Sequence, residues 1–497
     1  MDCSALPLPV DLYRADQVRA LDQAAVERAG MAGITLMENA GAAAWEVLAQ
    51  AWPGARRITV ICGGGNNAGD GYVSARLAAA AGRDVRVIVL KTPGELHGDA
   101  ATAAQRFLQA GSSVQSWSGQ DLCAADVIVD ALLGTGIDRD VGGRFREVIE
   151  AANAAAVPVL AVDIPSGLNA DTGAVMGTAI RAAHTVTFVG LKQGLLTGQG
   201  PECCGRLHFH GLGVPTETYA GVTAAARRLH PGLFGHLLAP RPRSAHKGYY
   251  GHVLVAGGDY GFAGAACMAA TAAARVGAGL VSVATRPEHA WALPVAQPEL
   301  MARGVAAAAD LKPLLERATV VALGPGLGQS DWSQRLLARI LDTDKPLVVD
   351  ADALNLLARE PAARANWVLT PHPGEAARLL GCTAAEVQAD RFACVRALQS
   401  RYGGTVVLKG SGTLVLGAAG PCGVCDGGNA GMASGGMGDI LTGVIAGLLA
   451  QGLEAGAAAA LGVCLHAAAA DQAAAGGGER GLLATDLLPW IRRLANP

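Results

Sequence analysis

Short runs of β-branched and other apolar residues alternate along the whole chain with Ala-rich stretches of helical length. In the first half, the runs that we predict as strands are Arg57–Cys62, Val85–Leu90, Asp126–Asp130, Pro158–Asp163 and Thr185–Val189. In the second half, they are His252–Ala256, Leu280–Ala284, Thr319–Leu323, Pro346–Asp350, Trp367–Thr370 and Thr405–Lys409. Strands that are apolar throughout and separated by helices are typical of parallel sheets covered on both faces. The pattern therefore predicts an α/β fold in both halves.

The alternation lapses between about residues 211 and 251. Four prolines gather there, namely Pro215, Pro231, Pro240 and Pro242. Proline density without a strand period is typical of a linker between domains. A chain of 497 residues also exceeds what one hydrophobic core usually serves. We therefore expect a first domain over residues 1–220, a linker over 221–240 and a second domain over 241–497.

The composition is that of a globular chain, with 51% hydrophobic and 16% charged residues. The net charge is −3 and no basic run occurs, so we expect no nucleic-acid partner. The 11 cysteines are scattered without the spacing of a zinc site, which suits a reducing cytoplasm. The N-terminus shows no signal peptide, and the apolar tract Ile440–Ala460 is rich in Ala and Gly, which favours a packed helix over a membrane span. We expect a cytoplasmic chain with no membrane partner.

A glycine-rich loop, GGGNNAGDG at residues 63–71, joins the predicted strand Arg57–Cys62 to a predicted helix over Tyr72–Ala81. Such a loop lets the backbone approach a phosphate, and the helix N-terminus supplies amides and partial positive charge. The loop fits the loose dinucleotide fingerprint, but Lys91 stands where a ribose-binding acid is usual. The fingerprint alone is therefore a weak sign of dinucleotide binding.

The loop is distinguished by polar side chains in the turn itself, Asn66, Asn67 and Asp70. Side-chain amides and a carboxylate hold ribose hydroxyls or a monovalent cation, which pyrophosphate binding alone does not require. The alternative is an Asn/Gly-rich turn selected for left-handed backbone angles. The placement between a strand and a helix favours the ligand-binding interpretation.

Two later strand ends repeat this theme, with Asp130 followed by ALLGTGIDRD and Asp163 followed by IPSGLN. In open parallel sheets, ligands bind beyond the carboxyl ends of the strands. We therefore expect Asp70, Asp130 and Asp163 to converge on one crevice. The alternative for any single member is that the carboxylate only caps a helix.

These motifs, with MENAG at residues 37–41, resemble the NAD(P)H-hydrate epimerase family over roughly residues 10–215. The resemblance implies a Rossmann-like three-layer α/β/α domain that interconverts the R and S forms of hydrated NADH and NADPH. It assigns a potassium ion to Asn67, Asp130 and Ser166, and substrate contact with acid–base catalysis to Asp163. It assigns further substrate contacts to Asn66, Asn67, Ala68, Gly69, Asp70, Gly134, Thr135, Gly136, Ile137, Asp138, Arg139 and Asp140. Ala68 departs from the family, which commonly has glycine there, and is tolerable only where the backbone angle is ordinary.

The second half carries glycine-rich segments of a different kind: GPGLG at 324–328, TPHPGE at 370–375, KGSGT at 409–413 and NAGMASGGMGD at 429–439. None matches G-x-x-x-x-G-K-[ST], so the chain is not a P-loop enzyme. The last segment places Asp439 beside glycine amides at the start of a predicted helix, Ile440–Leu449. The amides stabilise a phosphoryl group there while the carboxylate accepts a hydroxyl proton. The plainer alternative is that Asp439 only adds a charge at a helix N-terminus.

With HKG at 246–248 and GFAGAA at 261–266, these segments resemble the ribokinase-like superfamily, and within it the ADP-dependent NAD(P)H-hydrate dehydratases, over about residues 240–495. The resemblance implies a ribokinase-like α/β domain with substrate contacts at Ala263, Gly326, His372 and Asp439. It implies nucleotide contacts at Lys409, Gly410, Ser411, Gly412, Thr413 and Gly438. The two prolines around His372 hold it on a stiff support, which suits a ligand contact but also a rigid turn.

Together the two resemblances imply repair of hydrated NADH and NADPH, with K⁺ in the first domain and Mg²⁺ and ADP in the second. Asp439 is expected to deprotonate or orient the C6 hydroxyl of the S form for attack on the terminal phosphate of ADP. Elimination then restores the cofactor and releases AMP and phosphate. We expect NADHX, NADPHX and ADP as the small-molecule partners, and a homo-oligomer. Two alternatives are a kinase for thiazole or pyrimidine precursors and, for the first half, a non-enzymatic cofactor sensor.

Overall fold

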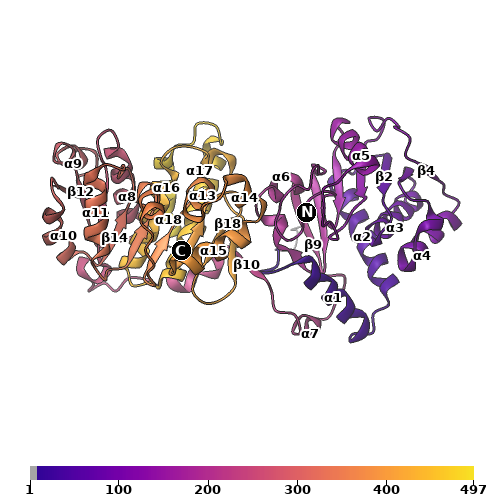
Figure 1. Cartoon of the computed structure of the whole chain (residues 1–497). Coiled ribbons are helices and arrows are strands. Elements are labelled where there is room, and N and C mark those ends of the chain that lie inside the picture. The colour runs from indigo at the N-terminus through magenta and orange to yellow at the C-terminus, as the bar shows by residue number, and fades with distance from the viewer. Residues whose placement is uncertain (1–7, 497) are drawn as a thin grey trace. The chain divides into compact units, whose positions relative to one another are not determined.

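The chain forms two compact units, Met1–Arg227 and Arg228–Pro497, in a computed structural model that describes residues 8–496 (Figure 1). The division falls inside the stretch 221–240 that the sequence predicts as a linker. That stretch is more regular than we expect, because β10 occupies Ala226–Leu229 and pairs antiparallel with β1, Asp11–Tyr13. Two adjacent arginines interrupt its apolar pattern, which is why the sequence shows no strand there.

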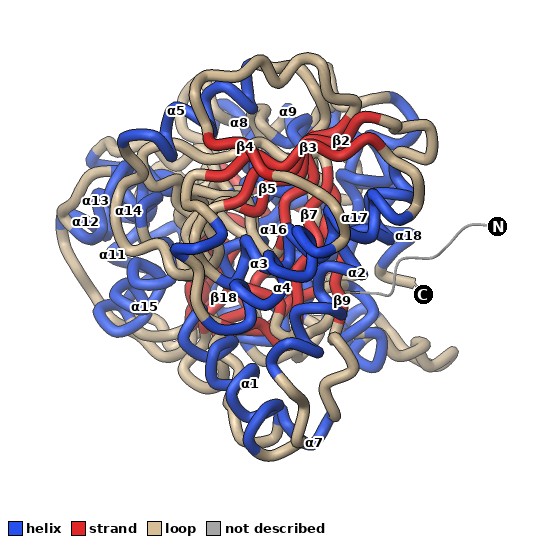
Figure 2. Tube along the Cα trace, turned by 90° about the vertical axis from the view of Figure 1, so that its right-hand side faces the viewer, coloured by secondary structure: helices blue, strands red, loops and turns tan. Residues whose placement is uncertain are grey.

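The first unit is built on a seven-stranded parallel sheet with the order β4-β3-β2-β5-β6-β7-β9. Its strands are β2 Arg57–Cys62, β3 Asp84–Val89, β4 Val114–Ser116, β5 Val127–Ala131, β6 Val159–Val162, β7 His184–Phe188 and β9 Arg206–His210. All five strands predicted in this half are confirmed. The edge strands β4 and β9 were not predicted, because β4 is short and β9 is polar. The chain leaves β2 toward β3 on one side and later returns to β5 on the other. This reversal of strand order opens a crevice at the carboxyl ends of β2 and β5. Figure 2 shows these strands side by side.

Helices cover both faces of this sheet, so the unit has three layers. They are α1 Ala15–Glu27, α2 Gly33–Ala51, α3 Asn66–Ala80, α4 Gly98–Gln109, α5 Gly143–Ala154 and the short α6 Gly200–Cys204 and α7 Thr216–Tyr219. Successive residues of β2 point to opposite faces: Val60 packs into the core formed with α2, α3 and α4, and Ile61 into the core formed with α5. The Rossmann-like α/β/α architecture predicted from the sequence is confirmed.

The second unit contains a sheet in the order β13-β12-β11-β14-β15-β16-β17-β18-β19, parallel as far as β17 and antiparallel beyond it. Its strands are β11 His252–Ala256, β12 Leu280–Thr285, β13 Met301–Gly304, β14 Val320–Leu323, β15 Leu347–Val349, β16 Trp367–Leu369, β17 Thr405–Leu408, β18 Thr413–Leu416 and β19 Cys422–Cys425. The six strands predicted in this half are confirmed. The exposed edge strand β13 and the hairpin β18–β19 were missed.

The helices of the second unit are α8 Ala263–Val276, α9 Ala292–Ala296, α10 Lys312–Arg317, α11 Asp331–Leu341, α12 Ala351–Arg359, α13 Pro373–Leu380, α14 Ala384–Ala389, α15 Arg391–Tyr402, α16 Met437–Ala450, α17 Ala455–Gly477 and α18 Leu487–Leu494. Helices α8, α16 and α17 share one core with β11 and β12. The apolar tract Ile440–Ala460 is not one helix as predicted, because Gly452 with φ +92° separates α16 from α17.

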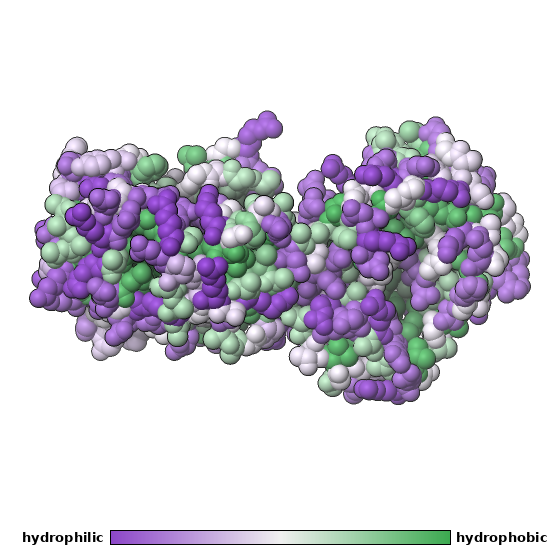
Figure 3. All heavy atoms as spheres, viewed as in Figure 1, coloured by the Kyte–Doolittle hydropathy of each residue, from purple (hydrophilic) through white to green (hydrophobic). Residues whose placement is uncertain are grey.

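One described helix, α17, is long and apolar enough to cross a membrane by length and composition alone. Within the unit, 67% of its most apolar window is buried, as expected of a core helix. Hydrophilic side chains cover much of the surface drawn in Figure 3, with apolar patches between them.

Candidate active sites

The first unit holds a cavity of about 930 Å³ beyond the carboxyl ends of β2, β5 and β6. A volume of this order accommodates a nucleotide-sized ligand. Of the residues that the sequence predicts to bind substrate here, those that line it are Asn66, Asn67, Asp70, Gly134, Thr135, Gly136, Ile137, Asp138, Arg139, Asp140 and Asp163. Ala68 and Gly69 do not line it; both are buried in the first turn of α3.

Helix α3 begins at Asn66, not at Tyr72 as predicted, so the asparagines belong to its first turn. None of the residues 63–71 has a left-handed backbone, which excludes the interpretation of this loop as a turn selected for such angles. The glycines serve close packing instead: a Cβ on Gly63 would lie 1.9 Å from the carbonyl oxygen of Leu132. Ala68 has ordinary helical geometry, so its methyl group is tolerated.

Asp130 is fully buried at the end of β5 and is held by Ser166. Its Oδ1 accepts a hydrogen bond from the Ser166 hydroxyl at 2.6 Å, and its Oδ2 accepts one from the Ser166 backbone N–H at 2.8 Å. Asn67 donates to the carbonyl oxygen of Leu133 at 3.1 Å, while its buried Oδ1 has no partner among the described residues. Burial raises the pKa of Asp130 to about 6. Asn67 and Asp130 are linked through the Leu133 carbonyl oxygen and the Ser166 hydroxyl. An unpartnered amide oxygen, a hydroxyl and a carboxylate form a set of oxygen ligands that suits a hard monovalent cation.

Asp163 follows β6 with φ +67°, a left-handed conformation that costs a non-glycine residue on the order of 1–3 kcal/mol. Its Oδ1 accepts hydrogen bonds from the ammonium group of Lys192, from the Thr187 hydroxyl at 3.4 Å and from the Phe188 N–H at 3.3 Å. The Lys192 side chain is only 1% exposed and also donates to the carbonyl oxygen of Phe188 at 3.1 Å. The strained backbone therefore presents to the cavity a carboxylate that is ion-paired with the buried Lys192.

Sequence reasoning missed several charged residues that line this cavity, among them Lys192 and Asp22. Lys192 ends an apolar run after β7, and Asp22 interrupts the apolar face of α1 next to Val18 and Leu21. In each case, a charge at a position where the pattern calls for an apolar residue is the signal that was available.

The second unit places Asp439 in the first turn of α16, after Gly436 with φ +91°. Burial, followed by the nearby carboxylate of Asp350, raises the pKa of Asp439 to about 7. The ammonium group of Lys409 is 2.7 Å from Asp350 Oδ1 and 3.8 Å from Glu375 Oε2. Asp439 is thus poised to exchange a proton near neutral pH.

Lys409 is predicted to contact the nucleotide, but its ammonium group is turned toward Asp350 and Glu375. The Thr442 hydroxyl donates to Asp350 Oδ2 at 2.8 Å and completes this network beneath the start of α16. A Cβ on Gly438 would lie 3.2 Å from the Lys409 nitrogen, so the network also touches the backbone before Asp439. Asp350 and Glu375 were not predicted as site residues, although Asp350 ends one predicted strand and Glu375 lies in the TPHPGE segment after another.

His372 is the N-cap residue of α13 and is half exposed. Its Nδ1 accepts a hydrogen bond from the Gly374 N–H at 3.0 Å, and its Nε2 lies 3.4 Å from Glu375 Oε1. Burial and the cations Lys409 and Arg378 lower its pKa, so the ring is neutral at pH 7. The geometry provides both a helix cap and an exposed ring edge for a ligand.

Two other predicted contacts are Ala263, the first residue of α8, and Gly326 on the GPGLG loop. The loop before α8 is hydrogen-bonded to the GPGLG loop. The Gly258 N–H donates to the Pro325 carbonyl oxygen at 3.0 Å, and the Asp259 N–H donates to that of Gly326 at 2.7 Å. Gly326 has φ +57°, and a Cβ there would come within 2.7 Å of Phe262 Cβ. The loop before α8 and the GPGLG loop therefore form one rigid wall.

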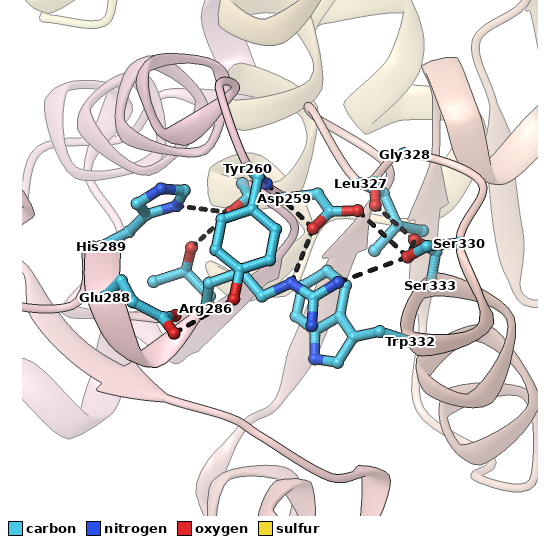
Figure 4. Close-up of polar contacts among 12 residues, drawn as sticks. Asp259, Tyr260, Arg286, Glu288, His289, Leu327, Gly328, Ser330, Trp332 and Ser333 are labelled. Atoms are coloured by element: carbon cyan, nitrogen blue, oxygen red, sulfur yellow. Dashed lines mark hydrogen bonds and ion pairs between the residues drawn. The ribbon is translucent and has the colours of Figure 1, made fainter.

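The guanidinium group of Arg286 fastens this wall, as Figure 4 shows. It donates to Asp259 Oδ1 at 2.6 Å and to the Ser330 hydroxyl at 3.4 Å. Its carbon lies 4.6 Å from the ring centroid of Tyr260 and 4.2 Å from that of Trp332. We call these five residues the Arg286 clasp.

No group of three or more His, Cys, Asp or Glu side chains in the described part of the chain is arranged to hold a metal ion.

Comparison with known proteins agrees with the geometry of both units. Residues 33–194 match the family model described as YjeF-related protein N-terminus, and residues 253–493 match the one described as NAD(P)H-hydrate dehydratase. A ribokinase-like superfamily protein from Enterococcus faecalis is similar in structure, with TM-score 0.51 and 30% identity over 55% of this chain and 98% of that one.

Two relatives match over nearly the whole length, both named bifunctional NAD(P)H-hydrate repair enzyme Nnr. The protein from Coxiella burnetii is 52% identical over 98% of this chain and 99% of its own, and that from Escherichia coli is 46% identical over 100% and 96%. The chain belongs to the family of bifunctional NAD(P)H-hydrate repair enzymes.

Proposed function

We propose that the first unit interconverts R- and S-NAD(P)HX and that the second dehydrates the S form at the expense of ADP, giving NAD(P)H, AMP and phosphate. The observation that carries this proposal is the pairing of two sites suited to different chemistry. A large cavity faces the ion-paired Asp163, and a separate glycine-rich helix start carries Asp439 with its pKa near 7.

In the first unit, the amides at the N-terminus of α3 face the cavity and suit the pyrophosphate of the substrate. Asn67, Asp130 and Ser166 are the residues that would hold K⁺, which would supply a fixed positive charge beside the phosphates. The unpartnered Asn67 Oδ1 supports this assignment. Asp163 would exchange a proton with the substrate at C6, where the hydroxyl group changes face.

In the second unit, Asp439 would take the proton of the C6 hydroxyl as that oxygen attacks the terminal phosphorus of ADP. The bond from that phosphorus to the bridging oxygen breaks, and AMP leaves. The new C6 phosphate ester then loses phosphate, with loss of a proton from C5, and the C5–C6 double bond is restored. Phosphorylation helps because phosphate is a better leaving group than hydroxide.

The amides of the loop that ends at Gly438 would face the developing charge of the phosphoryl group. Gly410, Ser411, Gly412 and Thr413 would contact the nucleotide, and Lys409 would act by fixing Asp350 and Glu375. Mg²⁺ would neutralise phosphate charge when bound with ADP. A homo-oligomer that works in the cytoplasm belongs to this proposal as well.

The test is to incubate the protein with mixed R- and S-NADPHX, ADP, Mg²⁺ and K⁺ while following absorbance at 340 nm. Recovery of NADPH from both epimers supports both activities. Recovery of the S fraction alone contradicts the epimerase assignment, and recovery with ATP but not ADP contradicts the choice of nucleotide. No recovery with either nucleotide favours a kinase of the same superfamily.

A further inference from the structure

We infer that Asp22 on α1 is a second catalytic acid–base of the epimerase site, acting with Asp163 on the C6 hydroxyl group of the substrate. This inference rests on the proposed epimerase function and adds to it. Asp22 lies outside residues 33–194, the range matched by the family model of the first unit.

The position of Asp22 is unusual for a charged residue. It lies on the inner face of α1, where Val18 and Leu21 are buried, and its side chain lines the cavity that also exposes Asp163 and Lys192. Among the described residues, no hydrogen bond or ion pair is formed by its carboxyl group. A half-buried carboxyl group without a partner costs stability, so a structural role does not account for it.

Asp163 differs from Asp22 in its bonding. Its Oδ1 accepts three hydrogen bonds, one of them from the buried ammonium group of Lys192. A carboxyl oxygen whose contacts are all donors is placed to act as an acceptor. Epimerisation by exchange of the hydroxyl group needs both a donor and an acceptor, and Asp163 supplies only the acceptor in the resting site.

The charged and titratable groups that act on Asp22 come from three other elements: Lys192 of β8, Asp163 after β6, and Asp70 of α3. Tyr219 of α7 also lies near, and its hydroxyl donates to the carbonyl oxygen of Val189. Burial is the largest effect and raises the pKa of Asp22 to about 6. The positive charge of Lys192 lowers this pKa, and the negative charge of Asp163 raises it further. Asp22 therefore carries and releases a proton close to neutral pH.

Asp70 is a less suitable donor, although it also lines the cavity. Burial raises its pKa well above the ordinary range, with Asp163 and Asp22 adding to the effect. A carboxyl group whose pKa lies well above its usual range releases its proton less readily, so it is less suited to repeated proton transfer.

In the conversion of R to S, one proton passes from Asp22 to the leaving hydroxyl group and one from the incoming water to Asp163. Protonated Asp22 gives its proton to the C6 hydroxyl as the C6–O bond breaks and water leaves, while the ring nitrogen lone pair forms a double bond to C6. Water then adds to the opposite face of C6, and its proton passes to Asp163. The two carboxyl groups exchange roles in the reverse direction, or return to the starting state through solvent.

The test compares Asp22→Asn with Glu27→Gln, which removes a charge from an exposed position of the same helix. Conversion of R-NADPHX is measured from pH 5.5 to 8 against an enzyme-free blank, and ADP-dependent use of S-NADPHX in the same chain reports on folding. We expect Asp22→Asn to slow R conversion about 100-fold and to leave S use unchanged. Glu27→Gln should match the wild type in both.

The pH profile separates a catalytic role from a structural one. R conversion by the wild type should fall as pH rises above about 6, because Asp22 must be protonated to act. Asp22→Glu should keep this dependence at a lower rate, and Asp22→Asn should lose it. R conversion within twofold of wild type in Asp22→Asn, or a profile for Asp22→Glu without the fall, overturns the inference. If Asp22→Asn also loses ADP-dependent use of S-NADPHX, that variant is misfolded, and the pH profile of R conversion by Asp22→Glu then decides between a catalytic and a structural role. No R conversion by the wild type contradicts the proposed function instead.

Discussion

Asp163 and Asp439 each lie beside the end of a strand or the start of a helix, yet the groups around the two carboxylates differ. Asp163 is paired with the buried Lys192. Asp439 is half-buried, and its burial together with the carboxylate of Asp350 raises the pKa of Asp439 to about 7. The nearby Lys409 is paired with Asp350 and Glu375. In the sequence, both residues look alike, since each is an aspartate in a glycine-containing motif at a strand end or helix start. The role of each carboxylate in proton transfer depends on charged partners from distant segments of the chain.

Asp439 acts as a base in the proposed reaction, so it must be ionised. Since its pKa is raised to about 7, we expect ADP-dependent use of S-NADPHX to increase as pH rises through 7 and then to level off. Asp439→Asn should lower kcat by at least about 100-fold and abolish this dependence, without affecting R-to-S conversion. The measurement is the initial rate at 340 nm from pH 5.5 to 9, and a wild-type rate that declines over this range would contradict the role.

The unpartnered amide oxygen of Asn67 leads to a prediction about thermal stability, which can be tested without an activity assay. If K⁺ binds there, 100 mM KCl should raise the Tm of the first unit by roughly 2–5 °C over tetramethylammonium chloride. Asn67→Ala should lose this increment. Asn153→Ala breaks two hydrogen bonds elsewhere in the same unit, so it should lower the Tm but keep the increment. An equal increment in Asn67→Ala would exclude this potassium site.

At the scale of elements, the Arg286 clasp connects the loop that leads into α8, where Ala263 is the first residue, with the GPGLG loop that carries Gly326. We expect Arg286→Ala to raise the KM for S-NADPHX about tenfold, because the wall loses its cation between Asp259 and Ser330 while Asp439 is untouched. Arg335→Ala is the matched control, since Arg335 forms only an exposed pair with Asp331. A fall in kcat with unchanged KM would show that the clasp does not shape the substrate site.

The elements that the sequence predicts well are the buried parallel strands, because apolar runs such as Arg57–Cys62 need no partner to be recognised. Edge strands such as β13 are short and exposed, so their pairing is decided by the neighbouring strand alone. The motif residues that reach the sites were likewise visible as strand-end polar clusters. Lys192 and Asp22 were not, because only the fold reveals that their segments line the same cavity as Asp163.

At the scale of the whole molecule, each site is complete within one unit. The cavity of the first unit is lined only by residues up to Leu212, and the Asp439 network draws only on residues beyond 228. Each unit also has its own hydrophobic cores. The two sites therefore share no described residue, and we expect the S epimer to pass between them as a free small molecule.

This independence predicts that two defective chains complement each other. Asp163→Asn should dehydrate only the S form, and Asp439→Asn should only interconvert the epimers. An equimolar mixture should convert all of a racemic NADPHX sample to NADPH, at about half the wild-type rate per total protein because each chain has one working site. The rate should be unchanged by a moderate excess of inert protein, since the S epimer diffuses freely. If the mixture consumed only the S fraction, the epimer would have to be handed over within one chain, and the units would not be independent catalysts.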